Sequence, residues 1–127
     1  MSTERLLLAQ LFAAIALYIV QKIGLHFFLV DPNNAFFAIS HYLGGVWIAL
    51  GIVWVSTVMG IRPSVLLCVA IALVIGATWE YFEVSTGMTA MSAPKYVSDT
   101  ISDLLMDSLG AVFGAIVSLK TSLFIKR

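Results

Sequence analysis

Charged residues are scarce in this chain of 127 residues, and their scarcity excludes most soluble folds. Only 11% of the residues are charged, whereas 61% are apolar and the mean hydropathy is +1.01. A soluble domain carries about 25% charged residues, so this chain has too little polar surface to face water on all sides. Its formal net charge of zero gives no long-range attraction to nucleic acid. We therefore expect an integral membrane protein whose partners include membrane lipids and no nucleic acid.

Cysteine is nearly absent as well. Cys68 is the one cysteine in the sequence, so the chain cannot form an intramolecular disulfide. It lies midway along an apolar run, where we expect it to fill space as a small apolar side chain. No stretch alternates apolar and polar residues with period two, as the wall of a membrane β-barrel must. The spanning elements are therefore expected to be helices.

Four apolar stretches are present, and each is long enough for a helix that crosses the bilayer. Turn-forming residues separate them at 31–34, 60–63 and 87–98, and Pro63 suits the first turn of the third helix. The predicted helices cover about residues 5–30, 35–59, 63–86 and 99–124. The sequence thus predicts an all-α integral membrane four-helix bundle, with residues 1–127 forming a single transmembrane domain.

The distribution of basic residues predicts the orientation of the bundle. Four spans place both termini and the second loop on one side, and basic residues near span ends favour the cytoplasm. That side holds Arg5, Arg62, Lys126 and Arg127. The opposite loops hold Lys95 and little other positive charge. We therefore expect the N- and C-termini in the cytoplasm and a multi-pass location in the cell membrane, which would be the inner membrane if the cell is Gram-negative.

The ionisable residues inside the predicted spans gather in the outer half of the membrane. They are Lys22, His26, His41, Glu80, Glu83, Asp99, Asp103 and Asp107. Ionisable groups in lipid are costly and are usually paired or functional. Asp99, Asp103 and Asp107 lie four residues apart on one helix stripe, which Gly110 and Gly114 extend. Because small residues let a neighbouring helix approach closely, we expect this stripe to face protein.

So many carboxylates cannot all be ionised together in a low dielectric, so either some hold protons or a cation lies among them. Oxygen-rich ligand sets with a histidine suit Mg²⁺, Mn²⁺, Ca²⁺ or Zn²⁺. The candidate metal ligands are His41, Glu80, Glu83, Asp103 and Asp107, and the further polar candidates are Lys22, His26 and Asp99. Simpler roles stay open, since Asp99 can cap a helix, His41 can be a packing histidine, and Glu83 and His26 can lie among lipid headgroups.

Three short sequence patterns, taken together with their order along the chain, resemble those of a known family. They are His-Tyr-Leu-Gly at 41–44, Trp-Glu-Tyr-Phe-Glu at 79–83, and the acidic stripe that ends at Gly110. Together they resemble the VanZ-like integral membrane proteins, and more closely the YjdF-type group of small bacterial inner-membrane proteins, over about residues 41–115. Asp103 and Gly110 match the VanZ-like pattern Asp-x3-Asn-x2-Gly, whereas Asp107 departs from it. The resemblance implies a membrane fold and action at the cell envelope, associated with teicoplanin resistance, but no particular reaction.

Three kinds of function are compatible with these features. The first is a metal-dependent enzyme or metal-binding protein that acts on a lipid-linked or cell-envelope ligand. The second is a proton or cation transporter in which the acids and His41 form a relay, which would need a homo-oligomer. The third is a non-catalytic protein that binds a ligand or partner at the outer face. Since no serine or cysteine nucleophile with a partnered base is visible, the sequence leaves open whether the protein is an enzyme.

Overall fold

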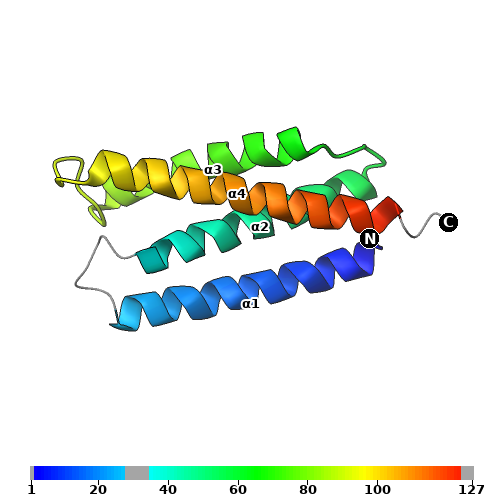
Figure 1. Cartoon of the computed structure of the whole chain (residues 1–127), viewed down its shortest axis with the longest axis horizontal. Coiled ribbons are helices and arrows are strands. Elements are labelled where there is room, and N and C mark those ends of the chain that lie inside the picture. Colours follow the sequence, from blue (N-terminus) through cyan, green and yellow to red (C-terminus); the bar gives the residue numbers. More distant parts are fainter. Residues whose placement is uncertain (1, 28–34, 124–127) are drawn as a thin grey trace.

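The computed structural model describes residues 2–27 and 35–123, and these residues form four helices (Figure 1). The helices are α1 (Thr3–Phe27), α2 (Ala35–Val58), α3 (Val65–Thr86) and α4 (Tyr96–Leu123). All four are long and apolar enough to cross a membrane, and the described residues contain no strand. The prediction of an all-α bundle of membrane-spanning helices is therefore confirmed.

Three helix starts differ from the predicted ones. α1 begins at Thr3, two residues before the predicted start, and the starts of α3 and α4 differ for local reasons. Pro63 does not lie in the first turn of α3, because Ser64 is the N-cap and its hydroxyl accepts the Leu67 N–H at 3.1 Å. α4 begins at Tyr96, three residues before the predicted start. The N–H of Asp99 already donates to the Lys95 carbonyl at 2.9 Å, so Asp99 lies inside the first turn and does not cap the helix.

The other predicted ends agree with the structure or lie beyond the described residues. α2 ends at Val58, one residue before the predicted end. α3 ends at the predicted residue, where Gly87 adopts the left-handed conformation (φ 74°) that commonly closes a helix. The predicted extension of the first helix to residue 30, the turn at 31–34 and residues 124–127 fall outside the described part of the chain.

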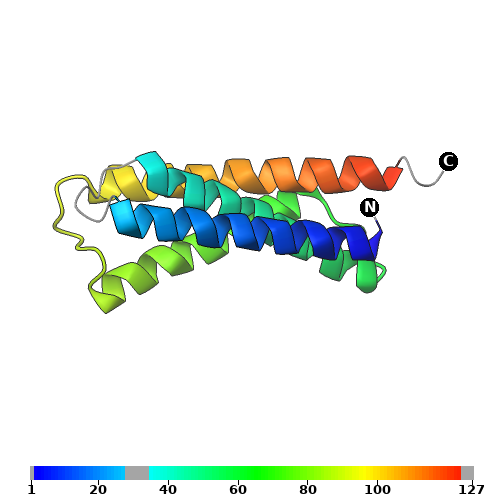
Figure 2. The same ribbon diagram turned by 90° about the horizontal axis from the view of Figure 1, so that it is seen from below.

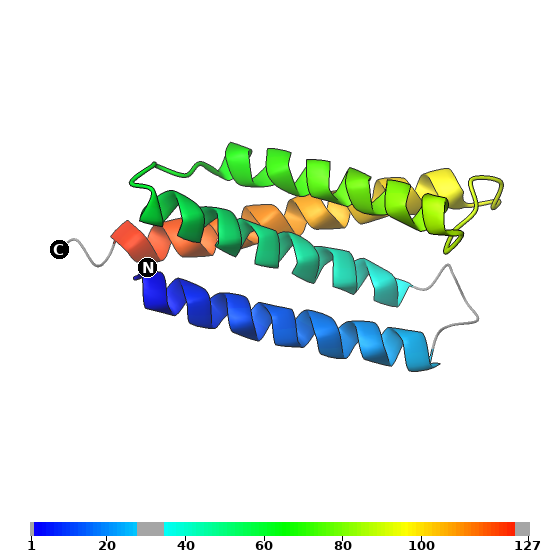
Figure 3. The same cartoon turned by 180° about the vertical axis from the view of Figure 1, so that it is seen from behind.

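α2 lies at the centre of the bundle and packs against α1, α3 and α4, whereas α1 packs mainly against α2 (Figures 1 and 3). α3 also packs against α4. Figure 2 shows that α2 and α3 are inclined in opposite directions, whereas the axes of α1 and α4 are nearly parallel to each other. The start of α1 and the end of α4 lie at the same end of the bundle (Figure 1), as four antiparallel spans require.

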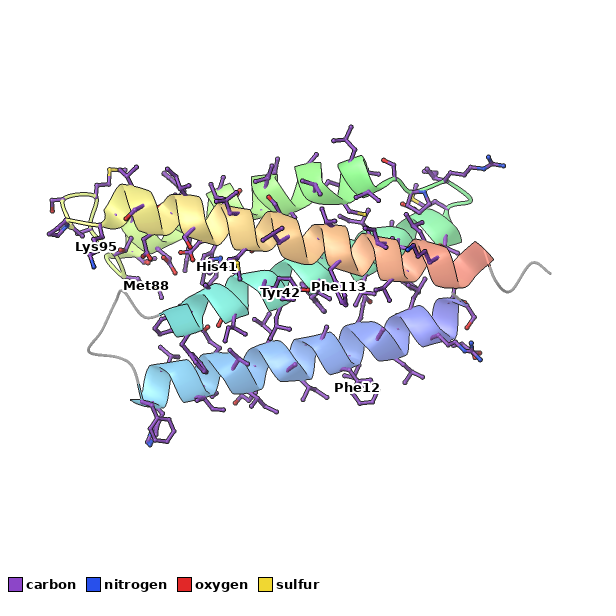
Figure 4. The ribbon with its side chains drawn as sticks, in the orientation of Figure 1. Phe12, His41, Tyr42, Met88, Lys95 and Phe113 are labelled. Atoms are coloured by element: carbon purple, nitrogen blue, oxygen red, sulfur yellow. The ribbon has the colours of Figure 1, made fainter. Side chains whose placement is uncertain are left out.

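The contact between α2 and α4 is close because glycines line it. A Cβ at Gly45 would collide with the Asp107 carbonyl, and one at Gly110 would collide with the Tyr42 carbonyl. Gly114 faces Val46 in the same way, with a Cβ position 2.9 Å from its carbonyl oxygen. The expectation that Gly110 and Gly114 face a neighbouring helix is therefore confirmed. The rings of Tyr42 in α2 and Phe113 in α4 lie 6.2 Å apart (Figure 4).

The buried core is small and takes residues from all four helices. Ala49, Ala111 and Ala115 are fully buried where α2 meets α4, and Cys68 is a free, fully buried thiol of α3. Its predicted space-filling role is confirmed. Large apolar side chains such as Phe12, which is 70% exposed and points away from the bundle, cover the outside (Figure 4). Such a surface suits lipid, which needs no polar coat.

Candidate metal centre

Three helices bring the candidate site residues to one depth. α2 and α4 enter the bundle from one end and α3 runs toward that end, so His41, Glu80, Asp103 and Asp107 all lie within a few turns of it. Figure 4 shows His41 at α2 close to α4, toward the end of the bundle that carries Met88 and Lys95. The four side chains therefore lie near the same end of the bundle, as the alternating direction of the spans predicts.

His41 contacts two carboxylates of α4, one with each ring nitrogen. Its Nε2 lies 3.6 Å from Oδ2 of Asp103, and its Nδ1 lies 3.5 Å from Oδ2 of Asp107. The side chains of His41 and Asp103 remain partly accessible, at 16% and 14% exposure, whereas that of Asp107 is buried. The imidazole thus bridges two successive turns of α4.

Glu80 is the buried acid that α3 contributes. It is 7% exposed, and its Oε2 accepts a hydrogen bond from the Thr100 hydroxyl of α4 at 2.9 Å. Its Oε1 is also buried and has no hydrogen-bond partner among the described residues. A buried carboxylate oxygen without a partner is costly, so this atom requires a ligand, a proton or a water molecule.

Three of these side chains are placed to hold one metal ion. His41, Glu80 and Asp103 each offer a ligand atom, and these atoms lie within 4.8 Å of one another. Two ligand atoms bound to the same small cation are at most about 4.2 Å apart, because each bond is about 2.1 Å. The group would therefore contract slightly around an ion. A single histidine balances at most one of the neighbouring carboxylates, which favours a cation over an anion here.

Asp107 lies beside this group, in a slot that is open because Gly76 has no side chain. A Cβ on Gly76 of α3 would collide with Oδ2 of Asp107, and a Cβ on Gly44 of α2 would lie 3.8 Å from Oδ1. The carboxylate therefore fits against α3 only because residue 76 has no side chain. The predicted ligand Asp107 is near the site, but its oxygens do not belong to the group of three ligand atoms.

Two further acidic candidates lie at the edge of the group. The Oε1 atom of Glu83 accepts a hydrogen bond from the indole N–H of Trp79 at 2.8 Å, which turns this carboxylate toward the exposed side of α3. Asp99 is exposed in the first turn of α4. Neither residue joins His41, Glu80 and Asp103 in the group of three ligand atoms.

The remaining polar candidates, Lys22 and His26, belong to α1 and lie apart from the group. Lys22 places its Nζ 5.6 Å from the centre of the Tyr18 ring, and the His26 ring packs edge-on against Phe27 at 4.7 Å. Both side chains are exposed. Since α1 packs mainly against α2, the structure does not bring these residues together with the acids of α3 and α4.

Thr100 is a site residue that the sequence patterns above do not single out. Its hydroxyl anchors Glu80, and the signal for it was present in the spacing. Thr100 precedes Asp103 by three residues and Asp107 by seven, so it belongs to the same stripe of α4. A hydroxyl on an acidic stripe inside a membrane span is a reason to look for a carboxylate on the neighbouring helix.

Comparisons with known proteins identify a family but no characterised relative. A family model with the description "Predicted membrane protein (DUF2238)" matches residues 5–122, and thus all four helices. Searches of the curated proteins and of the solved structures find no match.

Proposed function

The chain belongs to the DUF2238 family of membrane proteins, and from that premise we propose that it binds a divalent metal cation inside its bundle. The ligands are His41, Glu80 and Asp103, and the site opens toward the end of the bundle that holds the 87–95 connection. Mg²⁺, Mn²⁺, Ca²⁺ and Zn²⁺ are the candidate ions, because the ligand set combines carboxylates with one imidazole.

The unpartnered Oε1 atom of Glu80 is the observation that carries this proposal. Hydrogen bonding to Thr100 satisfies only the other oxygen of the carboxylate. A cation near His41 and Asp103 would complete the coordination of Oε1 and offset the mutual repulsion of the acids. A buried carboxylate oxygen with no partner among the described residues supports a bound ligand at this position.

We place the site in the outer half of the cell membrane, where it would act on a lipid-linked or cell-envelope ligand. The proposed orientation rests on Arg5 and Arg62, and on the exposed Lys120 in the last turn of α4, which all lie toward the opposite end of the bundle. The resemblance to VanZ-like and YjdF-type proteins, which implies action at the envelope, agrees with this orientation. A homo-oligomer remains a prediction.

The distribution of charge favours binding over transport. No charged residue or histidine occurs in 6–21, 42–61, 63–79 or 108–119. These ranges cover most of the four spans on the side of the bundle away from the proposed site. A proton or cation relay requires ionisable or coordinating groups along the whole path. The site therefore supports a cation that is held at one depth rather than passed across the bilayer.

Ion-dependent thermal stability tests the proposal. The midpoint temperature of thermal unfolding is measured for the purified protein in detergent, once with a chelator and once with each of the four divalent ions. We expect at least one ion to raise this midpoint in the wild type. Glu80→Gln should abolish the rise, because a ligand stabilises only the state that binds it. Glu83→Gln is the control, since it removes a carboxylate three residues away that lies outside the ligand group. A wild type that no ion stabilises, or an equal response of both variants, would contradict the proposal.

A further inference from the structure

We propose that Asp107 and Thr100 are positioning residues, which leave the cation with three protein ligands and with open coordination positions for water or for an oxygen atom of a ligand. Asp107 acts through His41, and Thr100 acts through Glu80. This inference rests on the proposed function and specifies how the site works.

The two nitrogens of His41 have different partners, which assigns them different roles. A neutral imidazole has one N–H and one lone pair, and a hydrogen bond at one nitrogen fixes the other as the ligand atom. Nδ1 faces Asp107 at 3.5 Å, and Nε2 faces Asp103, a member of the ligand group, at 3.6 Å. An Nδ1–H directed at Asp107 therefore leaves the Nε2 lone pair for the cation. Carboxylates orient metal-binding histidines in this way in many metal sites.

The slot around Asp107 keeps its carboxylate on the Nδ1 side. Oδ2, the oxygen that faces His41, lies against the backbone of Gly76, and Oδ1 faces Gly44. The carboxylate is thus enclosed by α2 and α3 and lies one helical turn deeper on α4 than the ligand Asp103. Packing, and not coordination, accounts for its position.

Thr100 has the matching role for Glu80. Its hydroxyl donates to Oε2, which holds the carboxylate in an orientation that leaves Oε1 free of protein partners. Since ligand carboxylates are themselves usually hydrogen-bonded, this bond presents one oxygen to the ion. Because the side chains of His41 and Asp103 are partly exposed, water or an oxygen atom of a ligand could reach an ion held there. Sites with three protein ligands commonly keep an open position for water or substrate.

Cobalt spectroscopy on the purified full-length protein in detergent separates ligands from positioning residues. Co²⁺ is titrated as the probe, and its visible absorption reports which atoms coordinate it. We expect Asp107→Asn and Thr100→Val to keep the wild-type spectrum at saturation while the dissociation constant rises about 10–100-fold. Thr100→Ser should restore the affinity, because it keeps the hydroxyl. We expect Glu80→Gln to lose the spectrum or change its shape.

A pair of glycine variants tests the role of Asp107 without removing its charge. Gly76→Ala places a Cβ where Oδ2 now lies and should weaken Co²⁺ binding about as much as Asp107→Asn does. Gly44→Ala is the matched control, because its Cβ would make an ordinary 3.8 Å contact and should leave the affinity unchanged. These variants keep the inference testable if Asp107→Asn does not fold.

The outcomes distinguish this inference from the proposed function. A wild type that binds neither Co²⁺ nor any of Mg²⁺, Mn²⁺, Ca²⁺ and Zn²⁺ overturns both. A wild type that binds Co²⁺, together with an Asp107→Asn spectrum that changes shape as the Glu80→Gln spectrum does, overturns only the inference, since Asp107 would then be a ligand. Equal affinities of Gly76→Ala and Gly44→Ala would also overturn it.

Discussion

The Nδ1 atom of His41 lies 3.5 Å from Oδ2 of Asp107, across the contact between α2 and α4. The same contact is the one in which Gly45 and Gly110 let the two backbones meet. This backbone contact therefore sets the distance between the His41 imidazole and the buried Asp107 carboxylate. A substitution that separates α2 from α4 would move the two side chains apart. A substitution that removes the imidazole would leave an unpaired buried charge between the two helices.

Removal of one buried charge should not destabilise the ion-free protein. Glu80→Gln keeps the shape of the side chain and can still accept from Thr100, but it removes one negative charge from the cluster. In the presence of a chelator, we expect the free energy of unfolding to stay equal or to rise by on the order of 1 kcal/mol. Thermal unfolding in detergent measures it. A clear loss of stability under chelation would show that the charge itself is stabilising.

Gly110→Ala should destabilise the bundle by about 1–3 kcal/mol, because its Cβ would meet the Tyr42 carbonyl and neither backbone can move aside easily. Gly51→Ala is the matched control. Its Cβ would lie 2.7 Å from Nε2 of Gln10, the far end of a flexible side chain that can rotate away, and alanine favours the helix. Thermal unfolding compares the two variants. Equal stability would contradict the assigned contact between α2 and α4.

The orientation is tested with cysteines in two exposed connections. A membrane-impermeant maleimide should label the Ser92→Cys protein in intact cells and the Ile61→Cys protein only after lysis, because the proposed orientation places the 59–64 connection, which holds Arg62, in the cytoplasm. The unmodified protein is the blank, since its Cys68 is buried. The reverse pattern would place the site in the inner half of the membrane and would end the envelope proposal.

His41→Gln should change the preference for metal ions. Imidazole nitrogen suits Zn²⁺, whereas carboxylate oxygen suits Mg²⁺, Ca²⁺ and Mn²⁺. We therefore expect this variant to lose more affinity for Zn²⁺ than for Mn²⁺, and its Zn²⁺ loss should exceed the about 10–100-fold loss expected for Asp107→Asn. Competition titrations with both ions measure the two losses. Equal losses for the two ions would argue that His41 does not coordinate the metal.

Much of the fold follows from the sequence, because span length and apolar composition are properties of single segments. Because successive spans run in opposite directions, the position of a residue along its span predicts its depth in the membrane. His41, Glu80 and Asp103 could therefore be expected near one another. The start of α4 at Tyr96 and the cap at Ser64 were missed because local hydrogen bonds decide them. Hydropathy does not detect such bonds.

Depth alone does not give the order of helices around the bundle, and the site depends on that order. Lys22 and His26 have a suitable depth, but α1 packs mainly on α2 and holds them away from the acids. Glu83 shares a helix with Glu80, yet Trp79 provides its partner. The roles of Gly76 and Thr100 depend on which face α3 turns toward α4, and a single sequence carries only a weak signal for that.

Diffraction from crystals grown with Zn²⁺, recorded at its absorption edge, tests the central claim most directly. We predict one anomalous peak about 2 Å from Nε2 of His41 and from one carboxylate oxygen each of Glu80 and Asp103, with Asp107 on the Nδ1 side of the ring. The account would be contradicted by crystals that contain Zn²⁺ but show no anomalous peak between these three side chains.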